Sequence, residues 1–430
     1  MKKNYSFFLF LFSFFFFFSS CKKNEKKETS TTQSADNQYR AYAEFEQQES
    51  VWLALPNVDH VHDLKNSSVT AQIIISLLPF TKVNFLCSSD SALQAFKPML
   101  PDSIWKNERL SVHIAPYQEF WMRDMGPVFL KNSKNERAML DLNFNNWGYE
   151  PDSMKVDLDE TLDERLAQKL NLPLVSNSLF HEGGDTELNG KGTLIVVEIV
   201  EKQRNPNMTL EQIEAVFKKT MGVKKVIWLK EGVREDDFTF QGPIPIANNK
   251  MGYTLLTTGG HIDEFCRFVN PTTVLLAQVD SSDLGDPIAQ ENLKRLAINE
   301  QILRNATDQD GKPLNIIRMP MPKTYTRLLT PKDWVYDIVG SSVKDKTPFL
   351  KKKPIIGIMA SSYLNFLIAN GVVLAQKYYK KGMDDSFRLR DEQSLQILKS
   401  VFPGRKIIQL DAASVNWGGG GVHCITANGF

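Results

Sequence analysis

The 430-residue chain has 51 Lys and Arg residues against 50 Asp and Glu residues, and its formal net charge of +1 argues against nucleic acid as a partner. Hydrophobic residues make up 42%, charged residues 23% and aromatic residues 10%, which is the composition of a globular protein. The length allows one large domain or two ordinary ones.

The N-terminus has the features of an export signal. A short basic segment, MKKNYS, precedes the apolar run Phe7 to Phe18, which is too short for a stable transmembrane helix and suits a signal-peptide core. Two serines then precede Cys21. This pattern resembles a bacterial lipoprotein signal, in which the cysteine becomes the lipid-modified first residue, and an ordinary secretory signal cleaved nearby is the alternative. We expect a signal peptide over 1–20, a lipid anchor on Cys21 and a location in the cell envelope, periplasmic or associated with the outer membrane.

A polar tether and one catalytic domain are expected to follow. Residues 21–40 are mostly charged or small and polar, so they cannot bury a core. From residue 41 to residue 430 the composition is globular and no Pro/Ser-rich linker interrupts it. We therefore predict a flexible tether over 21–40 and a single domain over 41–430.

Strand-like and helical segments alternate along this domain, which predicts a mixed α/β fold. Strands are predicted over 50–56, 82–87, 111–116, 192–200, 224–229 and 272–278. Helices are predicted over 67–79, 209–222 and 391–402. The helix over 209–222 is the best defined, because Thr209 and Gln212 match a capping box and Gly222 supplies a stop.

A weak internal repeat runs through the sequence. In each copy a chemically active or polar residue beside glycine or asparagine precedes a short apolar strand, usually with a turn and a second strand. The five copies cover 121–130, 182–197, 259–277, 363–376 and 418–426. Such a repeat would let five hairpins meet at a shared centre, although any α/β protein contains several turn-linked strands.

The cysteines point to one reactive thiol. The chain has four, at positions 21, 87, 266 and 424, so an odd number remains when Cys21 is set aside for lipid. Cys424 follows the glycine run 418–421, which predicts an accessible nucleophile. On an extended strand its neighbour His423 would face the opposite side, so we interpret His423 as a bystander and prefer His261 as the base.

Three further motifs carry candidate polar groups. If GGHIDEFCRF is a strand, His261 and Asp263 share one face and form an acid–base and cation-binding pair. WMRDMGP places Arg123 and Asp124 before a Gly-Pro turn, and HEGGD places Glu182 before two glycines. The alternatives are a surface histidine, a structural Arg–Asp ion pair and an ordinary β-turn.

Two common types of site are not indicated. The glycines at 418–421 have no helix after them, so they do not form a dinucleotide loop. The histidines and cysteines lack zinc-ligand spacing. We therefore expect neither a metal nor another cofactor.

Taken together and in order, the motifs resemble those of the agmatine deiminase / bacterial peptidylarginine deiminase family of guanidino-group-modifying enzymes. The segments that carry the resemblance are 43–56, 121–127, 143–148, 182–184, 204–214, 260–269, 360–371, 402–406 and 418–426. The resemblance implies a pseudo-fivefold α/β propeller with a central active site. It also implies Cys424 as nucleophile, His261 as general acid and base, Asp124 and Asp263 as the carboxylates that bind the guanidinium, and Glu182 as a carboxylate beside the histidine.

The remaining implied substrate contacts are Trp121, Arg123, Asn365 and Gly420. A guanidinium is a planar cation whose N–H donors match carboxylates in pairs, and its charge also favours the thiolate over the thiol. The segment 231–260 looks longer than in agmatine deiminases, so the resemblance does not fix recognition of the substrate tail.

The resemblance therefore implies hydrolytic deimination through a covalent amidino-thioether. Agmatine, giving N-carbamoylputrescine and ammonia, is the expected substrate, and an arginine-containing peptide or free arginine, giving citrulline, is the alternative. A non-catalytic lipoprotein that binds guanidines is a more remote possibility. Amidinotransfer and papain-like proteolysis rank lower, the latter because its cysteine is expected near the start of a mature chain.

Overall fold

The computed structural model describes residues 38–149, 158–238 and 242–430. The predicted signal peptide, Cys21 and most of the predicted tether therefore lie outside the described residues. The first strand, β1 (Arg40–Ala41), begins where the sequence becomes globular and pairs with β5 (Val128–Lys131). Among the described residues, no helix combines the length and the apolar character that crossing a bilayer requires.

One three-stranded unit recurs around the molecule. Its first two strands form an antiparallel hairpin, and a helical connection leads to a third strand parallel to the second. Four units occur in chain order. The first comprises β5, β6 (Arg137–Leu140), α5 (Leu162–Leu170) and β7 (Leu174–Val175), and the second comprises β8 (Glu187–Leu188), β9 (Thr193–Val197), α6 (Glu198–Arg204), α7 (Leu210–Met221) and β10 (Lys225–Leu229). The third comprises β13 (Cys266–Asn270), β14 (Thr273–Gln278), α8 (Pro287–Asn305) and β15 (Asn315–Pro320), and the fourth comprises β18 (Leu367–Ala369), β19 (Val372–Gln376), α11 (Asp385–Val401) and β20 (Lys406–Leu410).

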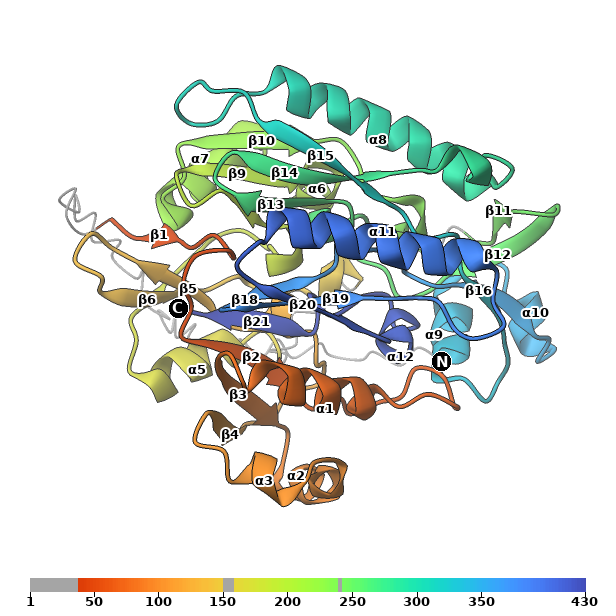
Figure 1. Ribbon diagram of the computed structural model, residues 1–430, viewed down its shortest axis with the longest axis horizontal. Coiled ribbons are helices and arrows are strands. Elements are labelled where there is room, and N and C mark those ends of the chain that lie inside the picture. Colours follow the sequence, from red (N-terminus) through yellow and green to blue (C-terminus); the bar gives the residue numbers. More distant parts are fainter. Residues whose placement is uncertain (1–37, 150–157, 239–241) are drawn as a thin grey trace, which may run out of the picture.

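The fifth unit joins the two ends of the chain and closes the ring. Its hairpin strands are β21 (Thr426–Gly429) and β2 (Ser50–Ala54), which pair antiparallel. Helix α1 (Asn66–Leu77) then leads to β3 (Lys82–Cys87), parallel to β2. In Figure 1 helix α8 lies along the top of the molecule, and α11 crosses the middle of the view between the strands of the third and fourth units. The predicted five hairpins and the pseudo-fivefold α/β propeller are confirmed.

Helices α1 and α7 show why these segments fold as the sequence predicts. In α1, Ile73, Ile74 and Leu77 are completely buried in the core that also contains strands β2 and β3. In α7 the Thr209 side chain accepts from the Gln212 backbone while the Gln212 side chain accepts from the Thr209 backbone, so the capping box is present. Gly222 follows with a left-handed φ of 66° and ends the helix.

The strand predicted over 192–200 is shorter than expected. Strand β9 ends at Val197 and helix α6 begins at Glu198. Acidic residues in the first turn of α6 and basic residues in the last turn match the helix dipole, which favours a helix over an extended strand here.

The segment 231–260 contributes two strands to an additional sheet. In sequence these strands lie between the second and third units, and the other two strands of the sheet lie between the third and fourth units. Strands β11 (Ile244–Ile246) and β12 (Lys250–Thr254) join β17 (Ile355–Ile358) and β16 (Thr326–Leu329). Helices α9 (Trp334–Ser342) and α10 (Thr347–Leu350) connect the last two of these strands in sequence. This sheet lies outside the five repeated units, and α9 reaches the site described below.

Shorter elements complete the described fold. They are α2 (Asp90–Phe96), η2 (Lys97–Met99), α3 (Asp102–Trp105), β4 (Leu110–Ile114), α4 (Met122–Met125), η3 (Asn146–Gly148), η4 (Gly183–Asp185), η5 (Arg234–Asp236), η7 (Ile262–Glu264), η8 (Ser281–Asp283) and α12 (Ala413–Asn416).

Candidate active site

Five loops converge on the site, and each precedes the first hairpin strand of one unit. Because the units are arranged around a ring, the residues just before these strands meet at its centre. The loops contribute, in chain order, Asp124, Glu182, the pair His261 and Asp263, Asn365, and Cys424. The ring therefore gathers side chains that are up to 300 residues apart in sequence.

Cys424 lies in the turn before β21 and is only 5% exposed. Its Sγ is 3.0 Å from the Asn365 amide nitrogen, 3.5 Å from Asp263 Oδ2 and 4.0 Å from Glu264 Oε1. Burial, reinforced by the carboxylates of Asp263 and Glu264, raises the pKa of the thiol well above its usual range. The thiol is therefore protonated in the free protein and needs a nearby cation to ionise.

His261 directly precedes the 3₁₀ turn η7 and Asp263 lies in it, so the strand considered for GGHIDEFCRF begins only at Cys266. The physical reason is that carboxylates take the backbone N–H groups that a strand would donate to its neighbour. Asp236 Oδ2 accepts from the backbone N–H groups of Gly260 and His261, each at 3.0 Å. Asp185 Oδ1 accepts from that of Ile262 at 3.1 Å.

The buried imidazole of His261 lies between two carboxylates. Its Nε2 is 3.3 Å from Glu182 Oε2, and its Nδ1 is 3.7 Å from Asp124 Oδ1 and has no hydrogen-bond partner among the described residues. Burial opposes the charged form, but Asp124 and Glu182 outweigh it and raise the pKa of His261 to about 10. His261 is thus an imidazolium at neutral pH, with a proton available for transfer.

Glu182 is held in place by Arg204, a residue that the sequence did not single out. Arg204 Nε donates to Glu182 Oε1 at 2.7 Å, and both side chains are fully buried. Burial opposes ionisation of Glu182, but the charge of Arg204 prevails and lowers the pKa of the carboxyl group to about 2. Glu182 is therefore a fixed negative charge beside His261.

Asp124 and Asp263 are the two other buried carboxylates of the site. Asp124 accepts from the Gly184 backbone N–H and from Trp147 Nε1, both at 2.9 Å. Burial raises the pKa of Asp124 despite the nearby charge of His261, and the negative charges of Asp263 and Glu182 add to the increase. A cation bound between these groups would relieve that repulsion.

Asp263 has one oxygen engaged and one oxygen unpaired. Oδ2 accepts from His423 Nδ1 at 2.7 Å and from the Asn365 amide at 3.1 Å. Oδ1 is buried without a partner among the described residues. Burial opposes ionisation, but the hydrogen bond from His423 prevails and lowers the pKa of Asp263. An unpaired buried carboxylate oxygen is costly, which points to a missing donor.

A cavity of about 290 Å³ opens above Cys424 and Asp124. We call it the Cys424 cavity. Its lining comprises Glu119, Trp121, Asp124, Asn146, Trp147, Tyr149, Leu256, Thr257, Thr258, Trp334, Ile338, Ser342, Gly418, Gly419, Gly420 and Cys424. Aromatic walls with a few polar groups are typical of a small-ligand site. Asp263 and His261 contact the lining residues Cys424 and Asp124, and Glu182 contacts His261.

The glycines at this wall are required by close approach. A Cβ on Gly420 would lie 2.7 Å from the Trp121 ring and 2.9 Å from Cys424 Sγ. Gly419 has a φ of 96°, and a Cβ there would collide with the backbone of Leu256. The glycine run therefore brings the thiol against the cavity wall without steric conflict.

Most residues expected from sequence meet at this site, and Arg123 is the exception. Trp121 and Gly420 line the cavity, whereas Asn365 lies behind the thiol. Arg123 instead donates to Asn428 at 2.8 Å and lines a separate small cavity together with Glu44 and Asn428. Its placement does not support the expected contact with substrate.

His423 is not the bystander that strand alternation predicts. Residues 422–425 form a turn before β21, so its side chain reaches Asp263 rather than the opposite face of a strand. Sequence reasoning also missed Trp147, although it lies within the motif 143–148, and it missed Trp334 and Glu119, which had no distinguishing pattern.

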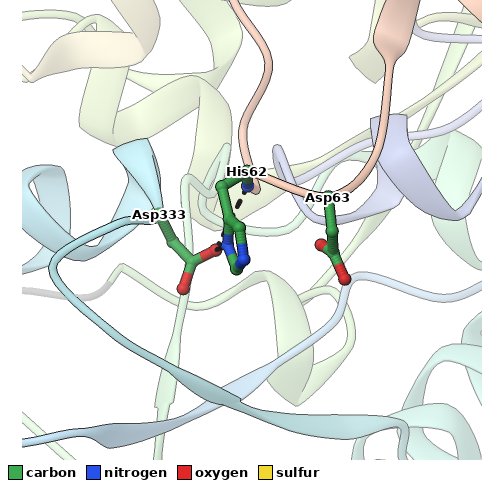
Figure 2. Close-up of side chains that lie close together, drawn as sticks. All are labelled: His62, Asp63 and Asp333. Atoms are coloured by element: carbon green, nitrogen blue, oxygen red, sulfur yellow. Dashed lines mark hydrogen bonds and ion pairs between the residues drawn. The ribbon is translucent and has the colours of Figure 1, made fainter.

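A second cluster of polar side chains supports the cavity from outside. Figure 2 shows His62 beside Asp333, with Asp63 nearby. Asp333 Oδ1 accepts from His62 Nδ1 at 2.7 Å, and its Oδ2 accepts from the Thr330 backbone at 2.8 Å. These contacts tie the segment after β2 to the start of α9, where Trp334 lines the Cys424 cavity.

Comparison with known proteins is consistent with this geometry. A family model described as Porphyromonas-type peptidyl-arginine deiminase matches residues 40–242 and 246–429. The chain is 31% identical to an agmatine deiminase of Pseudomonas syringae pv. syringae over 311 residues, which cover 71% of this chain and 73% of that protein. It is 28% identical to an agmatine deiminase of Medicago truncatula, over 89% of this chain and 94% of that protein.

Solved structures show the same fold. An agmatine deiminase of Enterococcus faecalis superposes with a TM-score of 0.71 at 24% identity and covers 92% of this chain and 96% of its own. A C. jejuni agmatine deiminase with substrate bound superposes with a TM-score of 0.65 at 20% identity, over 91% and 96% of the two chains.

Proposed function

Because the chain belongs to the Porphyromonas-type peptidyl-arginine deiminase family, we propose that it hydrolyses a guanidino substrate, agmatine, to N-carbamoylputrescine and ammonia. The observation that carries this proposal is the environment of Cys424. A buried thiol lies beside an ionised carboxylate with an unpaired oxygen, Asp263, and near an imidazolium, His261. A guanidinium would supply the missing N–H donors and the missing positive charge.

Binding orients the guanidinium and activates the thiol. Asp124 and Asp263 accept its N–H groups from two sides and place its carbon next to Cys424 Sγ. The cation offsets the negative charges that hold the thiol protonated, so the thiol proton is released to solvent and the thiolate forms. Activation therefore depends on the substrate.

The covalent step and the hydrolytic step share one acid–base group. The thiolate attacks the guanidinium carbon, the C–N bond breaks, and the His261 imidazolium protonates the departing nitrogen to give ammonia. The neutral imidazole then takes a proton from water, and the oxygen attacks the amidino-thioether. Collapse breaks the C–S bond, returns a proton to the thiolate and releases the ureido product, while ammonia leaves as ammonium with the proton released on binding.

The lining of the Cys424 cavity favours a substrate with a cationic tail. Among the residues that line it, the ordinarily charged ones are Glu119 and Asp124, both acidic. Among the described residues of this lining, the α-carboxylate of free arginine would meet no positive partner, whereas the terminal amine of agmatine would meet Glu119 and the aromatic walls. Peptidylarginine, which lacks a free α-carboxylate, is the second candidate, and the description of the matched family favours it.

The decisive assay compares four substrates on the purified protein. We expect ammonia and N-carbamoylputrescine from agmatine, with slower or undetectable turnover of peptidylarginine, free arginine and butylguanidine. A protein that releases ammonia from none of these guanidines is not a deiminase. Faster turnover of peptidylarginine than of agmatine would reverse the order of the two candidates.

Replacing Glu119 with glutamine should weaken recognition of the tail. Loss of one charged hydrogen-bond partner is expected to raise KM for agmatine by about 3- to 30-fold with little change in kcat. Butylguanidine, which has no terminal amine, is the matched control substrate, and its kinetics should be the same in both proteins. An equal rise in KM for both substrates would show that Glu119 does not recognise the tail.

Replacing Gly184 with alanine should disrupt the catalytic geometry. A Cβ at this position would lie 2.7 Å from Asp124 Oδ1 and closer still to His261 Nδ1. Because a displacement of about 1 Å can cost about 10²-fold, we expect kcat/KM for agmatine to fall by that order. Gly285→Ala, where a Cβ meets no atom within 4 Å, is the matched control and should keep wild-type kinetics.

We further propose that the protein is exported and anchored through lipid on Cys21. The basic segment, the apolar run Phe7 to Phe18 and the cysteine that follows support this proposal. Cys21→Ser is expected to abolish labelling by radioactive palmitate and to move the protein out of the detergent phase on Triton X-114 partition. Unchanged labelling of the variant would contradict a lipid anchor on Cys21.

A further inference from the structure

The ring of His423 is clamped between two carboxylates behind the active site. Its Nδ1 is 2.7 Å from Asp263 Oδ2, and its Nε2 is 2.7 Å from Glu44 Oε2. His423 is 1% exposed, Asp263 is fully buried and Glu44 is largely buried. Three residues from distant parts of the chain thus form a continuous hydrogen-bonded line that ends at the carboxylate next to Cys424.

The contacts of His423 require both ring nitrogens to donate. An ionised carboxylate only accepts hydrogen bonds, and a neutral imidazole has a proton on one nitrogen alone. Burial opposes ionisation of Glu44 and Asp263, yet the charge and hydrogen bonds of His423 help to lower the pKa of each. The arrangement is therefore that of an imidazolium between two carboxylates.

Glu44 is fixed at the far end of this line. Its Oε2 also accepts from Arg267 Nη2 at 2.6 Å, and its Oε1 accepts from the Ile368 backbone N–H at 2.6 Å. These donors prevent Glu44 from moving toward solvent and compensate its buried charge. The imidazole of His423 is consequently held in one orientation.

As a result, the two carboxylate oxygens of Asp263 have different hydrogen-bond environments. Oδ2 is occupied by His423 and Asn365, whereas Oδ1 is unpaired. We propose, on the basis of the deiminase function argued above, that His423 and Glu44 are a positioning pair in which a buried imidazolium keeps Asp263 ionised and turned so that Oδ1 is free for the guanidinium. His423 acts through Asp263 and does not touch the reacting atoms.

Other charges around Asp263 act together with His423. The groups that face it are His261 and Glu264 from its own turn, Asp124 and Arg123 from α4, Arg267 from β13 and Cys424 from the turn before β21. The acidic neighbours favour protonation of Asp263, so removal of the imidazolium leaves this carboxylate easier to protonate.

Two substitutions separate the contacts of His423. The amide nitrogen of asparagine lies near the position of Nδ1, so His423→Asn keeps a donor to Asp263 but loses the charge and the contact with Glu44. The amide nitrogen of glutamine lies near Nε2, so His423→Gln reaches Glu44 and leaves Asp263 without this donor. We expect kcat/KM for agmatine to fall by about 10- to 100-fold in His423→Gln and by less in His423→Asn.

The pH profile distinguishes positioning from a purely structural role. Both variants lack the positive charge, so the pKa of Asp263 should rise and the acid limb of kcat/KM should move to higher pH. Glu44→Gln should move the limb in the same direction by less. A uniform loss at all pH values would overturn the proposal. His113→Asn, a half-buried histidine on β4, is the control and should leave the profile unchanged.

A measurement that needs no turnover tests the charge state directly. In protein labelled with ¹⁵N-histidine and kept under the conditions of the assay, His423 should show two ring N–H signals, assigned by their absence in His423→Asn. A single ring proton in an active wild-type enzyme would refute the positioning pair and leave the deiminase function intact. Two ring protons in a protein that releases no ammonia from any guanidine would refute the function instead. If His423→Gln does not fold, the pH profile of His423→Asn and the ¹⁵N spectrum of the wild-type protein still test the positioning pair.

Discussion

Replacing Cys424 with alanine is expected to lower ammonia release from agmatine by at least about 10³-fold, because removal of a nucleophile leaves only binding and electrostatic effects. The carboxylates that bind the guanidinium, Asp124 and Asp263, stay in place, and the pKa of neither depends mainly on the thiol. Agmatine should therefore still bind the variant. Isothermal titration of Cys424→Ala and steady-state ammonia release from both proteins test the two halves of this expectation.

The same variant separates an enzyme from a guanidine-binding lipoprotein. A binding protein would keep its affinity in Cys424→Ala and would show no turnover in the wild type. For an enzyme, acid quenching of wild-type protein during turnover should trap an adduct on the peptide that contains Cys424, and mass spectrometry of the alanine variant should show none. Cys266→Ser is the control, because this buried thiol lies on β13 and has no expected role in turnover.

The repeated units were predictable because their information is local. In each copy, a polar loop, a short apolar strand and a turn occur within about 20 residues, and backbone hydrogen bonding fixes the hairpin from there. Closure of the ring was harder to foresee from pattern alone. It depends on β21 pairing with β2, strands at opposite ends of the sequence, which periodicity does not report.

Cys424 could be chosen as the candidate nucleophile for a similar reason. A glycine run before Cys424, and an odd number of cysteines once Cys21 is set aside, are both visible in sequence. The orientation of the His423 side chain could not be predicted, because strand alternation applies only to an extended strand and residues 422–425 form a turn. The partner of its Nε2 is Glu44, 379 residues away, and only the tertiary fold brings the two together.

The turn at His261 also could not be predicted from local sequence pattern. His261 and Asp263 were expected on one face on the condition that GGHIDEF is a strand, yet Asp236 and Asp185 accept hydrogen bonds from the backbone N–H groups of this segment. Asp185 comes from the second unit and Asp236 from the segment between the second and third units, so the local pattern of GGHIDEF could not reveal the competition. The functional prediction for His261 did not depend on the strand, because the resemblance to deiminases assigned its role from the motif itself.

Replacing His261 with asparagine is expected to lower kcat for agmatine by about 10²- to 10⁴-fold, the usual contribution of a general acid–base group. Its folded pKa of about 10 lies above the ordinary value of 6.5 because Asp124 and Glu182 outweigh burial. The imidazolium that we propose as the proton donor to the departing nitrogen is therefore present at neutral pH and is lost as pH rises through about 10. The guanidinium keeps its charge over this range, and butylguanidine has no amine that titrates there, so the alkaline limb of the wild-type profile with butylguanidine reports His261.

The free energy of unfolding should also depend on the titration of His261. A pKa raised on folding stabilises the native state fully below the unfolded value of 6.5, and this contribution disappears as pH rises through the folded value of about 10. His261→Asn should thus narrow the difference in free energy of unfolding between pH 7 and pH 10, and it should abolish the alkaline limb of kcat. A variant that keeps that limb, or loses less than tenfold in kcat, would assign the proton transfer to another group. Because Glu182 and Asp124 favour the charged imidazole in the free protein, the group that stabilises the fold at neutral pH is also the one that we propose as the source of the catalytic proton.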